Sequence, residues 1–149
     1  MTVGDICDRR VPTAAGTTTV LAAAKSMHGF DEHLLVVTEE REGKLVAIGI
    51  VTERELVAVM AQEGVPCRLT LRDIMGPPPG FVTESDDVYD TALWMRRNRL
   101  RDIVVHDLAG KLLGIVSMDQ LVESLADEVG EAVSSSAAER TMQRRNALH

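Results

Sequence analysis

Arginine residues gather at one point of the sequence and could together hold a negatively charged group. Arg96, Arg97, Arg99 and Arg101 stand within six residues, where a helix is predicted to end and a strand to begin. Cations are favoured at a helix C-terminus, which accounts for one or two of them. The others indicate a local anion site built from guanidinium groups. Arg54 lies in the first turn of another predicted helix, where a cation opposes the helix dipole, so a negative group is expected nearby.

Two hydroxyl residues stand directly before predicted helices and share one pattern. Thr52 is followed by Glu55 and Ser117 by Gln120, in each case three residues later. This spacing fits the capping box, in which a hydroxyl and an acid or amide side chain satisfy each other's backbone N–H groups at the start of a helix. The pattern predicts a helix start at both places, with Thr52 and Ser117 as the caps.

Signals of catalysis and of metal binding are absent from the sequence. It contains no Gly-x4-Gly-Lys-Ser/Thr phosphate loop and no Gly-x-Ser-x-Gly turn. Cys7 is interpreted as a buried apolar residue, and Cys67 has no neighbouring base. His28 and His33 are five residues apart, a spacing that suits no common metal pair. We therefore predict a protein that is not an enzyme and holds no metal.

The composition is that of a folded, acidic protein. The chain has 149 residues, of which 45% are hydrophobic and 3% aromatic, and its formal net charge is −7. An excess of acidic residues argues against binding to a nucleic-acid polymer, because phosphate neutralisation requires a surplus of Lys and Arg. The sequence shows neither a signal peptide nor 18 consecutive apolar residues. These features predict a cytoplasmic protein without a membrane segment.

The sequence repeats itself, and the repeat explains how these polar residues are positioned. With an offset of 68 residues, Val36-Val37 falls on Val104-Val105. With an offset of 65, Gly49-Ile50-Val51-Thr52 falls on Gly114-Ile115-Val116-Ser117. The offset changes only around a Gly-Lys pair, where a hairpin loop tolerates changes of length. We interpret the chain as a tandem duplication with units at 1–64 and 65–127.

Each unit has the same predicted elements. A short extended lead-in precedes a helix capped by Thr or by Ser and Asp, then a β-hairpin and a second helix follow. The second helices are predicted over residues 53 to about 61 and 118 to about 127. Ser134-Ser135-Ser136 interrupts the apolar pattern, so the tail at 128–149 is predicted to be either helical or disordered. One unit cannot cover both faces of so small a sheet, whereas two units packed sheet to sheet can.

Motifs at both ends of each unit resemble those of a known family. Asp5-Ile6 and Asp73-Ile74-Met75 open the units, while the runs from Gly49 to Leu56 and from Gly114 to Leu121 close them. These motifs are similar to those of a CBS-domain pair, named after cystathionine beta-synthase, and the resemblance covers about residues 3–126. It implies an α+β fold of two β-α-β-β-α units joined through their sheets. It also implies a stand-alone pair that forms a homodimer.

The resemblance further implies a ligand and the residues that would contact it. The family binds adenosyl ligands, namely AMP, ADP, ATP or S-adenosylmethionine, in clefts between the units. Its ribose contacts come from a Gly-hydrophobic-hydrophobic-Ser/Thr-x-x-Asp motif, whose hydroxyls are kept here while Glu55 and Gln120 replace the Asp. The candidate ligand-binding residues are Thr13, His33, Leu34, Thr52, Arg54, Glu55, Phe81, Arg101, Asp102, Ser117, Asp119 and Gln120. Whether Glu55 and Gln120 contact ribose or only cap helices is left open by the sequence.

Two hypotheses for the function follow from the resemblance. In the first, the chain is a regulatory sensor that binds an adenine nucleotide, requires no cofactor and passes the state of its cleft to a protein partner. A ligand between the units would act by its differential affinity for one arrangement of them. In the second, the pair binds no ligand and serves as a scaffold for dimerisation or for a protein partner. The replacement of both Asp residues by Glu55 and Gln120 favours the second hypothesis.

Overall fold

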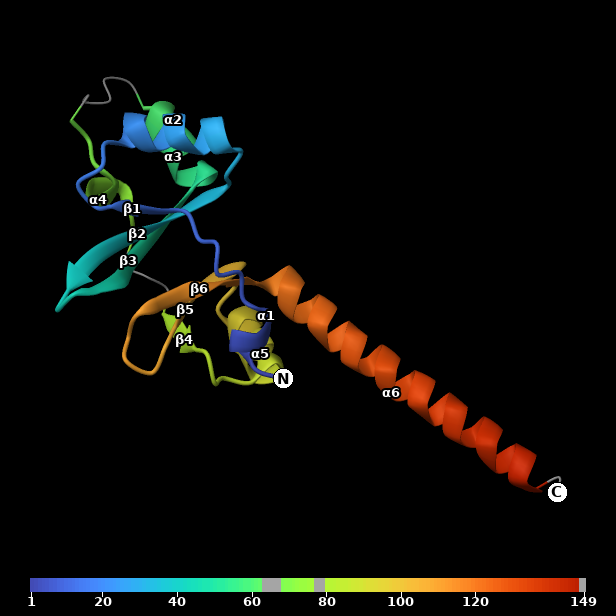
Figure 1. The fold of residues 1–149 in the computed structure, drawn as a ribbon. Helices are drawn as coiled ribbons and strands as arrows, with labels where there is room; N and C mark the ends of the chain where they lie inside the picture. The colour runs from blue at the N-terminus through green and yellow to red at the C-terminus, as the bar shows by residue number, and fades with distance from the viewer. Residues whose placement is uncertain (63–67, 77–79, 148–149) are drawn as a thin grey trace.

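Two small sheets of identical topology form the body of the protein (Figure 1). The computed structural model describes residues 1–62, 68–76 and 80–147. In each sheet the first strand is parallel to the second, and the second and third form an antiparallel hairpin. The elements are α1 (Val3–Ile6), β1 (Thr13–Ala15), α2 (Val20–Phe30), β2 (Leu34–Arg41), β3 (Lys44–Thr52), α3 (Glu53–Met60), α4 (Leu71–Ile74), β4 (Phe81–Thr83), α5 (Val88–Arg97), β5 (Asp102–His106), β6 (Leu112–Ser117) and α6 (Met118–Ala147).

Local sequence signals account for most of these elements. The Thr19 hydroxyl accepts a hydrogen bond from the Ala22 amide at 3.1 Å, and the Asp87 carboxylate accepts one from Asp90 at 3.0 Å. These caps begin α2 and α5 where the apolar periodicity begins. In the first hairpin turn Gly43 has a φ of 76°, in the left-handed region that glycine adopts without strain. The order of elements predicted for each unit is confirmed.

The register of the two hairpins shows the duplication in three dimensions. Val36 pairs with Ile50 in the first hairpin, and Val104 pairs with Ile115 in the second. Both ladders shift register after a corresponding residue, Val37 or Val105. Residues that matched in the sequence therefore occupy equivalent places in the two sheets, including the strand ends that precede α3 and α6.

The two sheets pack against each other through one small apolar cluster. Val36, Ala47, Val104 and Ile115 are buried there, and each sheet supplies two of them. Because β-branched and small side chains fill this interface, the sheets need no aromatic residue to pack closely. The predicted α+β fold with sheet-to-sheet packing is confirmed.

The segments that lead into the two units are exchanged between the hydrophobic cores. Val3, in α1, is fully buried in the cluster that contains Val88 and Met95 of the second unit. Leu71, in α4, is fully buried in the cluster that contains Val20 of the first unit. Backbone hydrogen bonds secure both exchanges, from the Val3 amide to the Asp86 carbonyl at 2.8 Å and from the Leu71 amide to the Thr18 carbonyl at 2.9 Å. Each core is thus completed by a segment that precedes the other unit.

Helix α6 continues far beyond the second unit. Its first turns pack on α5 and α1 and bury Leu121 and Ser124, and the helix then extends away from the body (Figure 1). It passes through Ser134–Ser136 without a break and reaches Ala147. The helix predicted to end near Asp127 is therefore longer than expected, because serine weakens a helix only slightly and no proline follows. No helix in the described residues is long and apolar enough to cross a membrane.

Substitution of Leu71 tests the exchange of segments. Leu71→Ala is expected to lower the free energy of unfolding by about 2–5 kcal/mol, because it leaves a cavity in the core of the first unit. Leu108→Ala is the matched control, since Leu108 is 79% exposed, and it should change stability by less than about 0.5 kcal/mol. Urea unfolding measures both. Equal effects would contradict the burial of α4 in the first unit.

Candidate ligand cleft between the sheets

A cleft of about 630 Å³ lies between the units, where β2 and β5 begin and β3 ends. Its volume falls within the range of small-molecule sites. The first unit contributes the ends of its hairpin and the first turn of α3, and the second contributes the segment before β5. The lining residues are His33, Leu34, Ile50, Thr52, Glu53, Arg54, Glu55, Gly76, Arg99, Leu100, Arg101 and Asp102.

Three guanidinium groups line this cleft. Arg54 comes from the first turn of α3, and Arg99 and Arg101 come from the segment between α5 and β5. Arg99 has a φ of 54°, so the chain turns sharply after α5 before it enters the cleft. Within the described part of the chain, none of the three forms an ion pair with a carboxylate. The cleft therefore holds three arginines that form no direct ion pair within the described residues, together with the carboxylates of Glu53, Glu55 and Asp102.

The acid at the start of α3 is engaged in a capping box. The Thr52 amide donates a hydrogen bond to Glu55 Oε2 at 2.7 Å, and the Thr52 hydroxyl donates to the same oxygen. Burial raises the pKa of Glu55, but the hydrogen bonds from Thr52, with smaller contributions from a backbone hydrogen bond and the charge of Arg54, leave the pKa below its ordinary value. The capping role predicted for Thr52 and Glu55 is confirmed.

Ser117 and Gln120 form the equivalent cap at the start of α6. The backbone N–H of Ser117 donates a hydrogen bond to Gln120 Oε1 at 2.8 Å, and the backbone N–H of Gln120 donates one to Ser117 Oγ at 3.1 Å. The amide oxygen of Gln120 thus does what the carboxylate of Glu55 does in the first unit. In both units these side chains have a structural role that requires no ligand.

A second, smaller hollow of about 500 Å³ begins where the first one ends. It is lined by Leu100, Arg101, Asp102, Ser117, Met118 and Asp119, so the two hollows share residues 100–102. Asp102 faces both. Burial raises the pKa of Asp102, the charge of Arg101 opposes this rise, and Asp119 adds to it.

The structure assembles most of the residues that the sequence singled out, but not all. Seven of the predicted ligand-binding residues line the larger cleft, and Ser117 and Asp119 line the smaller one. Thr13 and Gln120 line neither of these two clefts. The residues missed by sequence reasoning include Leu100 and Gly76. The repeat offers a signal for Gly76, because an offset of 68 residues aligns Gly76 with Asp8. Asp8 pairs with Ile115 in β6, the strand of the second unit that is equivalent to β3.

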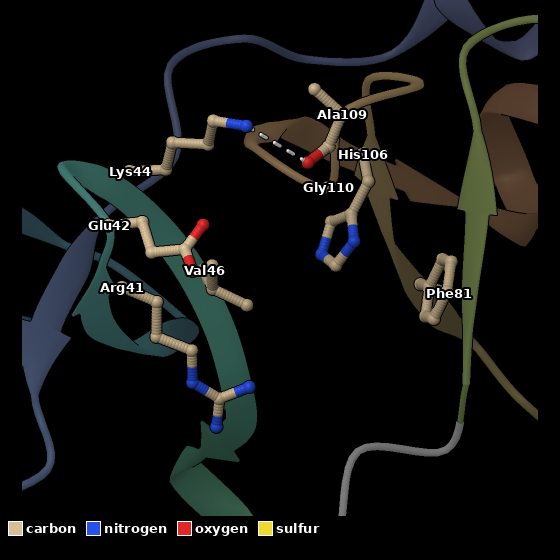
Figure 2. A pocket seen from close by; sticks show the side chains of 8 residues that line it. All are labelled: Arg41, Glu42, Lys44, Val46, Phe81, His106, Ala109 and Gly110. Atoms are coloured by element: carbon tan, nitrogen blue, oxygen red, sulfur yellow. Dashed lines mark hydrogen bonds between the residues drawn. The ribbon is translucent and has the colours of Figure 1, made fainter.

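Phe81 lies in a different hollow, near the hairpin turns (Figure 2). This hollow of about 710 Å³ also contains Arg41, Lys44 and His106. The Phe81 ring stacks on the His106 imidazole with a centroid distance of 4.7 Å and an interplanar angle of 17°. Burial lowers the pKa of His106, although Asp107 opposes this shift. Phe81 is thus a stacking partner of His106 here and lies away from the capping boxes.

These observations define a class of protein: a duplicated α+β module with a cleft, lined by arginines and carboxylates, between two packed sheets. The family model described as CBS domain matches residues 3–62 and 71–127. The chain belongs to this family.

Individual proteins support this assignment. An uncharacterised protein of Methanopyrus kandleri is 33% identical over 126 residues, which are 83% of this chain and 62% of that protein. This chain therefore spans less than two thirds of that relative. The structure of CBSX2 in complex with AMP is 25% identical with a TM-score of 0.70, and the match covers 85% of this chain and 96% of that one. The CBS domain pair of protein MJ0100, bound to 5-methylthioadenosine and S-adenosyl-L-methionine, has a TM-score of 0.70 and 23% identity, covering 86% and 98%.

Exchanging the acid of one cap and the amide of the other, as Glu55→Gln and Gln120→Glu, tests their capping role through the pH dependence of stability. The pKa of Glu55 is lowered in the folded chain, so its ionised form contributes stability above the ordinary Glu pKa of about 4.3. That contribution is lost as the pH falls through the lowered value. Glu55→Gln should keep the cap at neutral pH, as Gln120 does, and lose less stability than the wild type below about pH 4.

Gln120→Glu is the matched control and should add acid sensitivity at the start of α6. Both variants are compared with the wild type by urea unfolding across the pH range. Identical pH profiles for the three proteins would contradict the account given for Glu55.

Proposed function

We propose that the protein is a regulatory module that binds an adenine nucleotide in the cleft between its two sheets. The observation that carries the proposal is the convergence of Arg54, Arg99 and Arg101 on one cleft of an acidic chain. Within the described residues these guanidinium groups form no ion pair, so they are available to donate hydrogen bonds to a phosphate. Leu34, Ile50 and Leu100 give the same cleft an apolar wall against which a purine could lie.

The ribose contact is assigned to a residue outside the capping pair. Glu55 Oε2 already accepts hydrogen bonds from Thr52, and Gln120 Oε1 from Ser117. Asp102 is the cleft carboxylate that lies just before the buried part of β5, at the rim shared by both hollows. A carboxylate can accept hydrogen bonds from two neighbouring hydroxyls of a sugar. Asp102 therefore takes the place of the ribose-binding Asp that the family motif has three residues after its Ser or Thr.

The relatives support the class of ligand. CBSX2 is described in complex with AMP, and the MJ0100 pair with 5-methylthioadenosine and S-adenosyl-L-methionine. All three ligands contain adenine attached to a ribose, whereas only AMP carries a phosphate. The three arginines of this cleft favour the phosphorylated member of that group.

Binding would regulate by holding the units in one arrangement. The cleft takes residues from both units, so a ligand there contacts both. It would shift the equilibrium between two arrangements of the units by the difference between its affinities for them. We propose that this arrangement is transmitted to a second copy of the chain or to a protein partner, and that the module itself catalyses no reaction.

A second candidate function is a scaffold that binds no nucleotide. Two observations favour it: both capping side chains are satisfied without a ligand, and α2 and α3 expose apolar side chains. Leu21 is 58% exposed, Val57 65% and Met60 67%. Exposed apolar groups of this size on neighbouring helices are typical of a protein interface.

Calorimetric titration with AMP, ATP, adenosine and S-adenosylmethionine separates these functions. We expect binding of AMP or ATP, and an upward shift of Tm at millimolar nucleotide. Arg54→Ala should weaken AMP by about tenfold while leaving adenosine nearly unchanged, because the phosphate loses a charged hydrogen-bond donor. Asp102→Asn should weaken AMP and adenosine by similar factors, because both contain the ribose.

Arg97→Ala is the matched control, since Arg97 ends α5 and lines neither cleft. It should change no affinity beyond about twofold. No heat with any of the four ligands, together with an unchanged Tm, would overturn the sensor function and favour the scaffold. Equal losses of AMP and adenosine in Arg54→Ala would refute its role toward phosphate.

A further inference from the structure

The larger cleft and the smaller hollow occupy equivalent places in the duplicated fold. Each lies where a hairpin ends and a helix begins, with Thr52 and the first turn of α3 in the larger cleft and Ser117 and the first turn of α6 in the smaller hollow. Strand pairing shows the same equivalence, since Leu34 pairs with Thr52 and Asp102 pairs with Ser117. The residues at matched positions can therefore be compared one by one.

One pair of matched positions carries opposite charges. The offset of 65 residues that aligns Thr52 with Ser117 also aligns Arg54 with Asp119. Arg54 and Asp119 are both exposed, and each lines the hollow beside its own helix. The smaller hollow thus has a carboxylate where the larger cleft has a guanidinium group.

A second carboxylate lies near Asp119. Asp102 occupies in the smaller hollow the place that the apolar Leu34 occupies in the larger cleft. The negative charge of Asp119 adds to the rise that burial causes in the pKa of Asp102, while the charge of Arg101 opposes that rise. The two carboxylates therefore interact, and a phosphate that entered this hollow would be a third negative group beside them.

The smaller hollow has little positive charge to offset these carboxylates. Arg101 is the one basic side chain among the described residues that line it, and Arg101 also lines the larger cleft. When Arg101 donates to a phosphate in the larger cleft, its charge is compensated there. Arg54 and Arg99 line the larger cleft but not the smaller hollow. A second phosphate would therefore be repelled without a guanidinium partner of its own.

The helix dipole makes the arginine, rather than the acid, the unusual residue of this matched pair. An acid is favoured in the first turn of a helix, so Asp119 suits the start of α6 without any ligand. Arg54 opposes the dipole of α3 at the matched position. The unfavourable cation thus lies in the cleft proposed to bind a phosphate, and the favourable acid lies in the other hollow.

We propose that Asp119 excludes phosphorylated ligands from the smaller hollow, so that the protein binds one nucleotide per chain although its fold is duplicated. An anion in the smaller hollow faces Asp102 and Asp119, whereas one in the larger cleft also meets the guanidinium groups of that cleft. A site can select its ligand by repulsion as well as by attraction. The inference rests on the proposed function, because it takes the larger cleft as the place where the nucleotide binds.

Counting bound AMP by equilibrium dialysis of the full chain tests the exclusion. The wild type should bind one AMP per chain. Asp119→Arg gives α6 the cation that α3 has in Arg54, and this variant should bind two AMP per chain. Its added site should bind AMP at least about tenfold more tightly than the smaller hollow of the wild type does, because a repelling carboxylate is replaced by a charged hydrogen-bond donor.

Two further variants separate repulsion from other effects of the substitution. Asp119→Asn removes the charge without adding a cation, and it should bind a second AMP with an affinity between those of the wild type and Asp119→Arg. Glu128→Arg is the matched control, because it makes the same change of net charge on the same helix. Glu128 is exposed and lines neither hollow, so this variant should bind one AMP.

The outcomes distinguish this inference from the proposed function. If the wild type and Asp119→Arg both bind one AMP, the larger cleft binds the nucleotide but the exclusion by Asp119 is overturned. If the wild type binds none and both Asp119 variants bind one, the exclusion holds and the function proposed for the larger cleft is wrong. Two AMP in the wild type, or none in any of the proteins, would overturn the exclusion. A gain in Asp119→Arg without a gain in Asp119→Asn would also overturn it, because the added cation alone would then explain the new site.

Discussion

The exchange of the lead-in segments is the constraint on which the rest of the structure depends. Val3 completes the core of the second unit, and Leu71 completes the core of the first. Neither core is closed by its own unit, so the units fold as a pair and the sheets are held face to face through Val36 and Val104. That packing brings the starts of β2 and β5 together, and the cleft lined by Leu34 and Asp102 follows from it.

The two adjoining hollows lie where α3 and α6 begin. Some of their polar side chains therefore cap a helix, and the others do not. The first turn of α3 needs acceptors for its free N–H groups, and Glu55 supplies one. A side chain held in this way is rigid but has less capacity for a ligand. The side chains left free of the caps are Arg54, in the first turn of α3, and Arg99, Arg101 and Asp102, at the entry to β5. In this chain the residues that cap the helices therefore differ from those proposed to bind the ligand.

Sequence patterns predicted the elements whose causes are local. Capping residues, hairpin glycines and strand periodicity gave the helices and strands of both units, and the matched hydroxyls gave both capping boxes. The location of Phe81 beside His106 could not be predicted, because it depends on strand register between β4 and β5. The exchange of Val3 and Leu71 likewise depends on long-range contacts, which local sequence patterns do not specify. The serines at 134–136 resembled a helix end, but helix endings need a residue that stops propagation.

Helix α6 connects the cleft to the outer surface in one rigid element. Met118 and Asp119, in its first turn, line the smaller hollow, and Arg145 lies near its far end. The helix extends for about 40 Å between these residues, so a small rotation at its first turn would displace the far end by a much larger distance. The direction of α6 is fixed by its first turns, where Leu121 packs in the same core cluster as Val3. The same exchanged segment that closes this core therefore also sets the direction in which the helix extends.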